Sequence, residues 1–130
     1  MLTTDEVEAS RASYLIEDVG PNQPLIVSFG FYAADNNPRF DFYGRLKKLE
    51  QLSGRPLGKL LVRDSSQLWY LNGIPGIADG VDATATALAQ MIEGLKPSHV
   101  ITIGQSMGAY AAILYGALLK VDKIIAFGPL

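Results

Sequence analysis

The chain has 130 residues, a net charge of -2 at neutral pH and no cysteine. At 48% hydrophobic and 18% charged residues the composition is globular, and the length fits a single domain. The slightly acidic balance argues against a nucleic-acid partner, and the lack of cysteine excludes disulfides, thiolate zinc sites and a cysteine nucleophile. No apolar run reaches the roughly 18 residues of a membrane span, and the start lacks a secretion signal. We therefore expect a cytoplasmic protein without a membrane partner.

Short apolar runs alternate with amphipathic stretches along the chain. The apolar runs are bounded by Gly, Pro or polar residues, as is typical of strands buried on both faces. The amphipathic stretches repeat apolar residues at helical spacing and end near Gly54 or Pro97. In chain order we expect a short helix or a loose end in the first ten residues, a strand within 12–19, a strand over 25–29, a loop over 30–39, a helix over about 40–53, a strand over 58–63, a loop over 64–79, a helix over about 80–95, a strand over 99–103, a helix over 107–119 and a strand over 122–127.

Strands that alternate with helices imply right-handed crossovers and a parallel sheet covered on both faces. The predicted fold class is therefore α/β, a three-layer α/β/α sandwich with a mostly parallel sheet. Apolar residues that recur at helical spacing in the first two long helices are Phe42, Leu46, Leu49 and Leu52, and then Val81, Ala85, Leu88, Ile92 and Leu95. In the third, the small residues Ala109, Ala112 and Gly116 are expected to let the helix pack close to the sheet.

The sequence Gly104-Gln105-Ser106-Met107-Gly108 lies between a predicted buried strand and the next helix. It is G-x-S-x-G in the strand–turn–helix context that a nucleophile elbow requires. A strained turn would lift the serine hydroxyl above the sheet edge, and glycine fits the two positions that come close together. The helix N-terminus favours developing negative charge, and the Met107 N–H would point to where an oxyanion forms. The alternative is a Gly-rich turn without chemistry.

A second oxyanion donor is expected in the loop after the strand over 25–29, since that loop commonly completes the oxyanion hole. We predict the Phe31 N–H for this role, or else the N–H of Gly30. Gly30 would let the backbone come close to substrate. The alternative is that Gly30 merely turns the chain.

The chain resembles the front half of an α/β-hydrolase domain. VITIGQSMGAYAAILYG followed by VDKIIAFGP is similar to the elbow strand, elbow helix and next strand of serine esterases and acyl-transfer enzymes, and LIVSFGF looks like their oxyanion strand and loop. LLVRDSSQLWYLNGIPG resembles a loop of a bacterial subgroup linked with surface-polysaccharide or glycosyltransferase functions. The resemblance covers roughly 12–130, with Ala109 in place of a second glycine. It implies the strand order 58–63, 25–29, 99–103, 122–127.

The partners of a serine nucleophile are missing. The family order is serine, acid, histidine, but after Ser106 the only acid is Asp122 and no histidine follows. His99 opens the strand that leads to Ser106, so seven extended residues place it roughly 23 Å away. A serine–base pair needs about 3 Å. We expect Asp122 to be a turn residue, and the chain to be a truncated piece whose acid and histidine lie elsewhere.

Four residues, the last of the strand over 58–63 and three of the loop after it, are candidates for a functional role. Asp64, Trp69 and Tyr70 are possible substrate-lining residues, the two aromatic rings forming a platform for a sugar or acyl group. The alternative for Asp64 is to hold its own loop through backbone N–H groups, and for the rings to pack the loop. Arg63 either holds an anionic group or pairs within the loop. No metal-ligand spacing or dinucleotide fingerprint is present, so no cofactor is expected.

The first functional hypothesis is a serine hydrolase of the esterase type, in which Ser106 attacks an ester or acyl carbonyl and Met107 and Phe31 stabilise the oxyanion. Its substrate would be a small-molecule, saccharide or lipid ester. The alternative is a non-catalytic α/β-hydrolase-like module for binding or assembly in polysaccharide or glycosylation pathways. A third hypothesis is an unrelated flavodoxin-like or Rossmann-like domain, with ordinary backbone angles at Ser106. The oligomeric state is left open.

Overall fold

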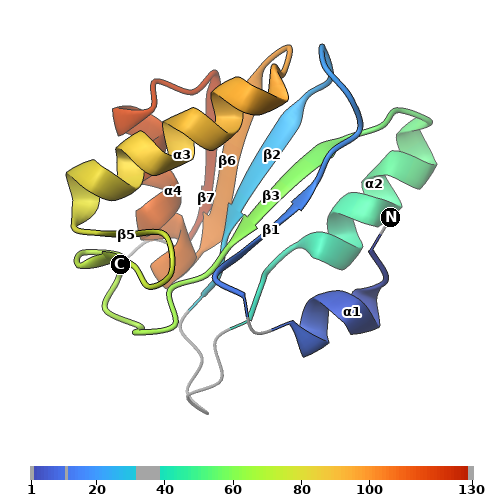
Figure 1. Cartoon of the computed structure of the whole chain (residues 1–130). Helices are drawn as coiled ribbons and strands as arrows, with labels where there is room; N and C mark the ends of the chain where they lie inside the picture. Colours follow the sequence, from blue (N-terminus) through green and yellow to red (C-terminus); the bar gives the residue numbers. More distant parts are fainter. Residues whose placement is uncertain (1, 11, 32–38, 129–130) are drawn as a thin grey trace.

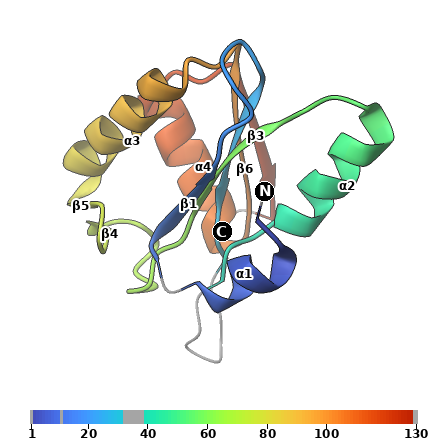
Figure 2. The ribbon, with the colours of Figure 1, turned by 45° about the vertical axis from the view of Figure 1, so that its right-hand side comes forward.

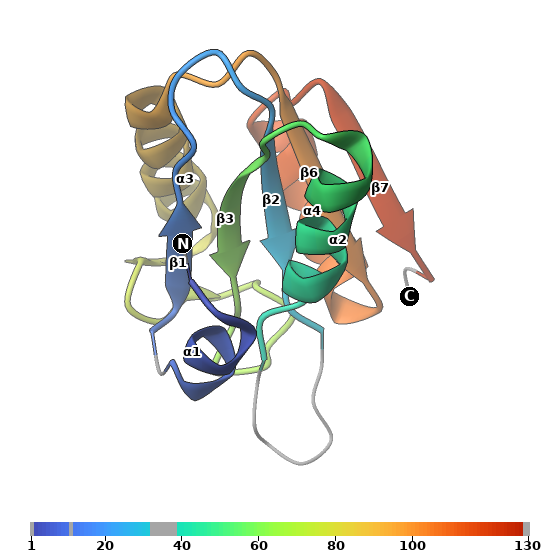
Figure 3. The same cartoon turned by 90° about the vertical axis from the view of Figure 1, so that its right-hand side faces the viewer.

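A five-stranded sheet forms the centre of the structure, a computed structural model that describes residues 2–10, 12–31 and 39–128. The strand order is β1-β3-β2-β6-β7, as Figure 3 shows. Strands β3, β2, β6 and β7 are parallel, and β1 pairs with β3 in antiparallel register at one edge. The bounds are β1 Tyr14–Glu17, β2 Leu25–Phe29, β3 Gly58–Val62, β6 Val100–Gln105 and β7 Lys123–Phe127. The α/β class and the expected strand order are confirmed.

Helices cover both faces of this sheet (Figures 1 and 2). On one face lie α1 (Thr4–Ala9) and α2 (Tyr43–Ser53), and on the other lie α3 (Val81–Leu95) and α4 (Met107–Leu118). The first residues form a helix rather than a loose end because a capping box of Thr3 and Glu6 satisfies its free N–H groups. No described helix is long and apolar enough to cross a membrane.

The predicted elements agree with the structure to within three residues at each end. One correction concerns the predicted loop over 64–79, which contains a small hairpin of β4 (Gly73–Ile74) and β5 (Ala78–Asp79) beside the start of α3. Two-residue strands are too short to leave an alternating pattern in the sequence. The expected loop over 30–39 falls mostly outside the described residues.

The core divides between the two faces of the sheet. Leu25, Val27 and Phe29 of β2 face α3 and α4, while Ile26 packs with Phe42 and Leu46 on the α2 side. All five β2 residues are buried, as a strand covered on both faces requires.

The predicted apolar face of α2 is partly wrong. Leu49 and Leu52 are 49% and 78% exposed. The inward stripe of the helix instead runs through Tyr43, Leu46 and Glu50, and the Glu50 carboxylate lies 2.6 Å from the buried Lys59 ammonium on β3. A buried charge attracts an opposite charge into the interface, which turns the two leucines toward solvent.

Helix α4 lies close to the sheet because its inner face is made of small residues. Ala109 and Ala112 are fully buried. A Cβ atom on Gly116 would come within 2.7 Å of Ile124 Cγ1 and 2.8 Å of Thr102 Oγ1. The expected close packing of this helix is therefore confirmed, and it brings the start of α4 against the end of β6.

We predict opposite effects for the same substitution at two helical glycines. Gly116→Ala should lower the free energy of unfolding by about 1–2 kcal/mol, because the new methyl overpacks the contact with β6 and β7. Gly94→Ala in α3 should raise it by about 0.5–1 kcal/mol, because a Cβ there meets no atom within 4 Å and alanine favours the helix. Urea unfolding measures both, and equal effects at the two sites would contradict the packing described.

Candidate active site

Ser106 joins β6 to α4 in a strained conformation. Its φ of 54° and ψ of -121° belong to a region that non-glycine residues rarely occupy. Its N–H donates to the Phe127 carbonyl of β7 at 3.0 Å, which fixes the turn to the neighbouring strand. Although Ser106 stands at the N-cap position, its half-buried hydroxyl does not cap the helix. These angles are not the ordinary ones that the flavodoxin-like or Rossmann-like hypothesis requires.

The glycines two residues before and after Ser106 are required by close backbone contacts. A Cβ on Gly104 would lie 2.1 Å from the Gly108 carbonyl oxygen, and a Cβ on Gly108 would lie 2.2 Å from the Phe29 carbonyl oxygen. Neither contact leaves room for any side chain. The end of β6, the start of α4 and the end of β2 therefore meet backbone to backbone around Ser106.

The same contact brings the first residues after β2 to the elbow. The Gly30 N–H donates to the Val62 carbonyl at 2.8 Å, and the Gly30 carbonyl accepts from the Tyr70 hydroxyl at 2.8 Å. The Phe31 N–H forms no hydrogen bond with another described residue. The N–H of Met107, the first residue of α4, has no intrahelical partner because of its position. Two predicted oxyanion donors thus lie at the sheet edge that carries Ser106.

Asp41 supports the elbow from the α2 side, and no local sequence pattern indicated it. Its Oδ2 accepts from Gln105 Nε2 at 2.8 Å, and its Oδ1 accepts from the Phe42 N–H at 2.8 Å. Its carbonyl accepts from the Ser28 hydroxyl of β2 at 2.9 Å. Gln105 is 64 residues from Asp41 in sequence, so only the fold reveals this pairing. The residue before Ser106 is held by a buried carboxylate.

The Asp64 carboxylate holds its own loop. Its Oδ1 accepts from the Ser66 N–H at 2.9 Å, and its Oδ2 accepts from the N–H groups of Leu68 and Tyr70, each at 3.0 Å. Asp64 is 1% exposed. The structure thus bears out the alternative that Asp64 holds its own loop and contradicts the possible substrate-lining role, because the carboxylate faces backbone donors and not the surface. The guanidinium of Arg63 similarly binds backbone carbonyls, those of Ser10 and Ala12.

The two aromatic residues of this loop point in different directions. Trp69 and Tyr70 both have left-handed backbones, with φ of 58° and 62°. Tyr70 is fully buried against Phe29, so the alternative of loop packing holds for it and the possible substrate-lining role does not. Trp69 is half-buried and meets the ring of Tyr110, one helical turn after Ser106, edge to face at 6.1 Å. Trp69 alone of the expected aromatic pair remains accessible near the elbow.

Burial fixes the protonation of the two core tyrosines. Loss of water raises the pKa of Tyr70 well above its ordinary value, and the nearby Asp64 charge raises it further. Burial likewise raises the pKa of Tyr115 to about 12. The Tyr115 hydroxyl donates to the Tyr70 carbonyl at 2.9 Å. Both hydroxyls are therefore protonated donors at neutral pH.

His99 and Asp122 lie at the opposite end of β6 from Ser106. His99 precedes the strand, and its Nδ1 lies 2.9 Å from the Ser98 hydroxyl. The Asp122 carboxylate accepts from the Val100 N–H at 2.7 Å, so this aspartate is the turn residue that the sequence predicted. Neither side chain can act on Ser106 within this chain.

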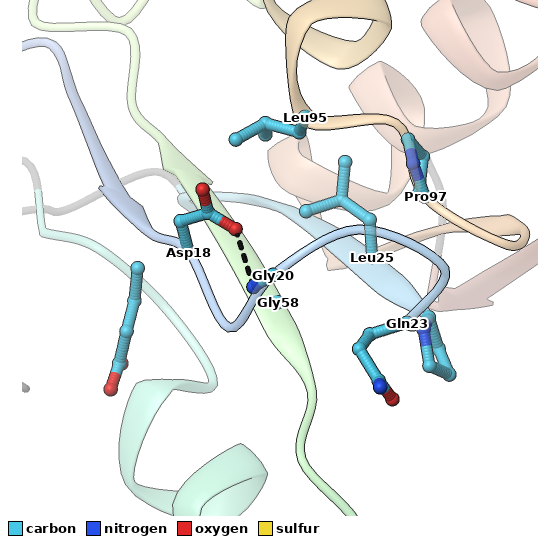
Figure 4. A pocket seen from close by; sticks show the side chains of 9 residues that line it. Asp18, Gly20, Gln23, Leu25, Gly58, Leu95 and Pro97 are labelled. Carbon is cyan, nitrogen blue, oxygen red and sulfur yellow. Dashed lines mark hydrogen bonds between the residues drawn. The ribbon is translucent and has the colours of Figure 1, made fainter.

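A cavity also lies at this far end of the sheet (Figure 4). Leu25, Leu95 and Pro97 line it together with the turn in which the Asp18 carboxylate accepts from the Gly20 N–H at 2.8 Å. Its volume is about 10 Å³, which is room for a single water molecule. It is too small and too distant to serve as the substrate site. Among the described residues, no group of three or more His, Asp or Glu side chains could hold a metal ion.

No protein-family model and no curated protein sequence matches this chain. Solved structures do match. The capsule O-acetyltransferase of Neisseria meningitidis serogroup A superposes with a TM-score of 0.65 at 18% identity, over 89% of this chain and 46% of the enzyme. A histidine-to-alanine mutant of that enzyme in complex with CoA gives a TM-score of 0.66 at 16% identity, over the same shares of the two chains.

An alpha/beta hydrolase enzyme from the sediment metagenome of the Mar Chica lagoon, Morocco, also matches, with a TM-score of 0.52 at 18% identity over 90% of this chain. The chain has an α/β-hydrolase fold. It spans about half the length of these enzymes, 46% of the O-acetyltransferase and 48% of the hydrolase. The Glycosylation Associate Protein complex from Streptococcus agalactiae matches at 20% identity with a TM-score of 0.54, over 90% of this chain and 22% of the matched chain.

The strain at Ser106 predicts a large difference in stability between two variants. Ser106→Gly should be more stable than Ser106→Ala by about 1–2 kcal/mol, because glycine adopts a positive φ without the cost that a Cβ atom adds. An ordinary N-cap also favours glycine over alanine, by roughly 0.5–1 kcal/mol, and the strain adds to this difference. Thermal and urea unfolding of the two variants measure the difference, and an alanine variant as stable as the glycine variant would contradict the strained turn.

Proposed function

We propose that this chain carries the nucleophile of a serine hydrolase of the esterase type, and that Ser106 is that nucleophile. The observation that carries the proposal is the strained Ser106 between β6 and α4, whose hydroxyl is not used as a helix cap. In the reaction, the Ser106 hydroxyl gives its proton to a base and Oγ bonds to the acyl carbon. The ester C–O bond breaks, the alcohol leaves after taking up that proton, and the acyl group stays on the serine. A water or a hydroxyl acceptor then takes the acyl group and restores the serine.

The N–H groups of Met107 and Phe31 are proposed to stabilise the tetrahedral oxyanion. Both belong to backbone that is already fixed, Met107 by the helix and Phe31 by the anchored Gly30 before it. Donors that need no rearrangement stabilise the transition state more than the ground state. No metal or organic cofactor is needed for this chemistry.

The base that activates Ser106 is proposed to come from outside this chain. The single histidine, His99, lies at the wrong end of β6, and the carboxylate of Asp122 belongs to a turn there. This fits the observation that the chain spans only about half the length of the matched enzymes. A histidine and an acid from the remainder of the protein would approach the sheet edge that carries Ser106.

A saccharide ester is the substrate class that we propose. One of the similar structures is a capsule O-acetyltransferase, and another is a glycosylation-associated complex. Tyr110 lies one helical turn after Ser106, and the ring of Trp69 meets it edge to face; both residues are half-buried. Such rings pack well against the apolar faces of sugar rings, and this would place a sugar hydroxyl or its ester near the serine.

The second candidate is a non-catalytic module for binding or assembly in a glycosylation pathway. The match to the Glycosylation Associate Protein complex favours it, and so does the distance between Ser106 and the only histidine. The two candidates differ in one chemical property, the reactivity of the Ser106 hydroxyl in the intact protein. A serine without a base is a weak nucleophile.

We predict that a fluorophosphonate probe labels the full-length protein once, on the peptide that contains Ser106. Ser106→Ala should abolish labelling. Ser98→Ala is the matched control, because Ser98 lies at the other end of β6, and it should leave labelling unchanged. Peptide mass spectrometry measures the adduct. Native protein without any adduct would overturn the hydrolase proposal and favour the binding module.

Trp69→Ala should weaken the use of a saccharide ester without impairing the chemistry at Ser106. We expect KM for an acetylated sugar to rise about 10-fold, since loss of an aromatic contact removes roughly 1–1.5 kcal/mol of binding. The value of kcat for p-nitrophenyl acetate should stay within twofold of the wild type. Steady-state kinetics with both esters test this. Equal losses on both substrates would contradict a sugar platform.

A further inference from the structure

One buried hydrogen bond links the loop after β3 to the loop after β2. The Tyr70 hydroxyl donates to the Gly30 carbonyl at 2.8 Å across 40 residues of sequence. Tyr70 is fully buried, packed edge to face on Phe29 and Tyr115. Its contact with Gly30 reaches the peptide group next to the proposed oxyanion donor.

The Gly30–Phe31 peptide has its carbonyl and its N–H on opposite sides, because it is planar and the described chain contains no cis peptide bond. The Tyr70 hydroxyl holds the carbonyl toward the core. The Phe31 N–H must therefore point away from the Tyr70 hydroxyl and the core. A hydrogen bond to one end of the peptide sets the direction of the other end.

Glycine at position 30 makes this restraint necessary. Two other contacts fix the position of Gly30. Its N–H donates to the Val62 carbonyl, and the Arg39 carbonyl oxygen lies so close that a Cβ at position 30 would be 2.3 Å from it. Neither contact fixes the rotation of the following peptide plane, and glycine permits more backbone rotations than any other residue. The Tyr70 hydroxyl is the contact that opposes a flip of the peptide.

Tyr70 has a strained, left-handed backbone conformation at this position. Its left-handed backbone is held by the Asp64 carboxylate at the N–H and by the Tyr115 hydroxyl at the carbonyl. A bulky residue at positive φ persists only where its surroundings fix it, and such residues cluster at functional sites. Packing alone would not require a hydroxyl at this position, since phenylalanine has the same ring.

We propose that Tyr70 is a positioning residue, which keeps the Phe31 N–H aimed at the oxyanion by holding the Gly30 carbonyl in the core. The proposal rests on the proposed function of Ser106. It assigns to Tyr70 a role in transition-state stabilisation and none in contact with substrate. Loss of the hydroxyl is expected to act on kcat and not on KM, because an oxyanion donor acts in the transition state.

The test compares Tyr70→Phe with Tyr43→Phe in the full-length protein, using p-nitrophenyl acetate. Tyr43 is the control because it is also buried and its hydroxyl also donates to a backbone carbonyl, that of Leu2, on the α2 side of the sheet. Each variant loses one such hydrogen bond, so both should lower Tm. Tyr70→Phe should lower kcat about 10-fold at unchanged KM, a smaller loss than complete removal of an oxyanion donor causes. Tyr43→Phe should keep kcat within twofold of the wild type.

A boronic acid, which forms a tetrahedral adduct with an active serine, supplies a second readout. Its affinity should fall by the same factor as kcat in Tyr70→Phe and stay unchanged in Tyr43→Phe. In ¹⁵N spectra, the Phe31 amide signal should move on adduct formation in the wild type and move less in Tyr70→Phe. This spectrum reports on the peptide directly and also shows whether the variant is folded.

Equal kcat and boronic acid affinity in the two tyrosine variants would overturn the positioning role while leaving Ser106 as the nucleophile. A second possible outcome is that Ser106→Ala turns over the ester as fast as the wild type. That outcome would overturn the proposed function, and the positioning role would fall with it. The Ser106→Ala variant, measured beside the tyrosine variants, separates the two cases.

Discussion

The close approach of three backbone segments around Ser106 is the constraint on which the rest of the site depends. Gly104, Gly108 and Phe29 meet at distances that no Cβ atom could enter, so β6, α4 and β2 converge at one point of the sheet edge. The small inner face of α4 allows this approach, and the strain at Ser106 is its consequence. A serine raised in this way has its hydroxyl at a helix N-terminus, where negative charge is favoured.

Buried polar side chains hold this junction from both sides of the sheet. Asp41 binds Gln105 on the α2 face, while Tyr70 binds the Gly30 carbonyl on the opposite face. Each acts on a residue adjacent to one that the proposed chemistry uses. Buried hydrogen bonds of this kind are costly to break, because a desolvated partner is left behind. The elbow and the proposed oxyanion donors are thereby preorganised by the fold itself.

Much of the fold could be predicted because its signals are local. Apolar runs such as LIVSF mark buried strands, and the glycines around Ser106 follow from the geometry of one turn. The features that could not be predicted depend on partners that are distant in sequence. Lys59 lies within an apolar run and is fully buried, yet nothing near it shows that Glu50 and Glu17 approach its ammonium. For Tyr70 the sequence left loop packing and substrate lining both open, because its left-handed backbone leaves no sequence signal.

Trapping of an acyl-enzyme is the most direct test of Ser106 as the nucleophile. The full-length protein would be mixed with an activated acetyl ester, quenched with acid within the first turnovers and digested for peptide mass spectrometry. If Ser106 is the nucleophile, an acetyl group is expected on it during turnover and is lost when the ester is exhausted. Ester consumption with no acetyl group on Ser106 at any time point would contradict this role.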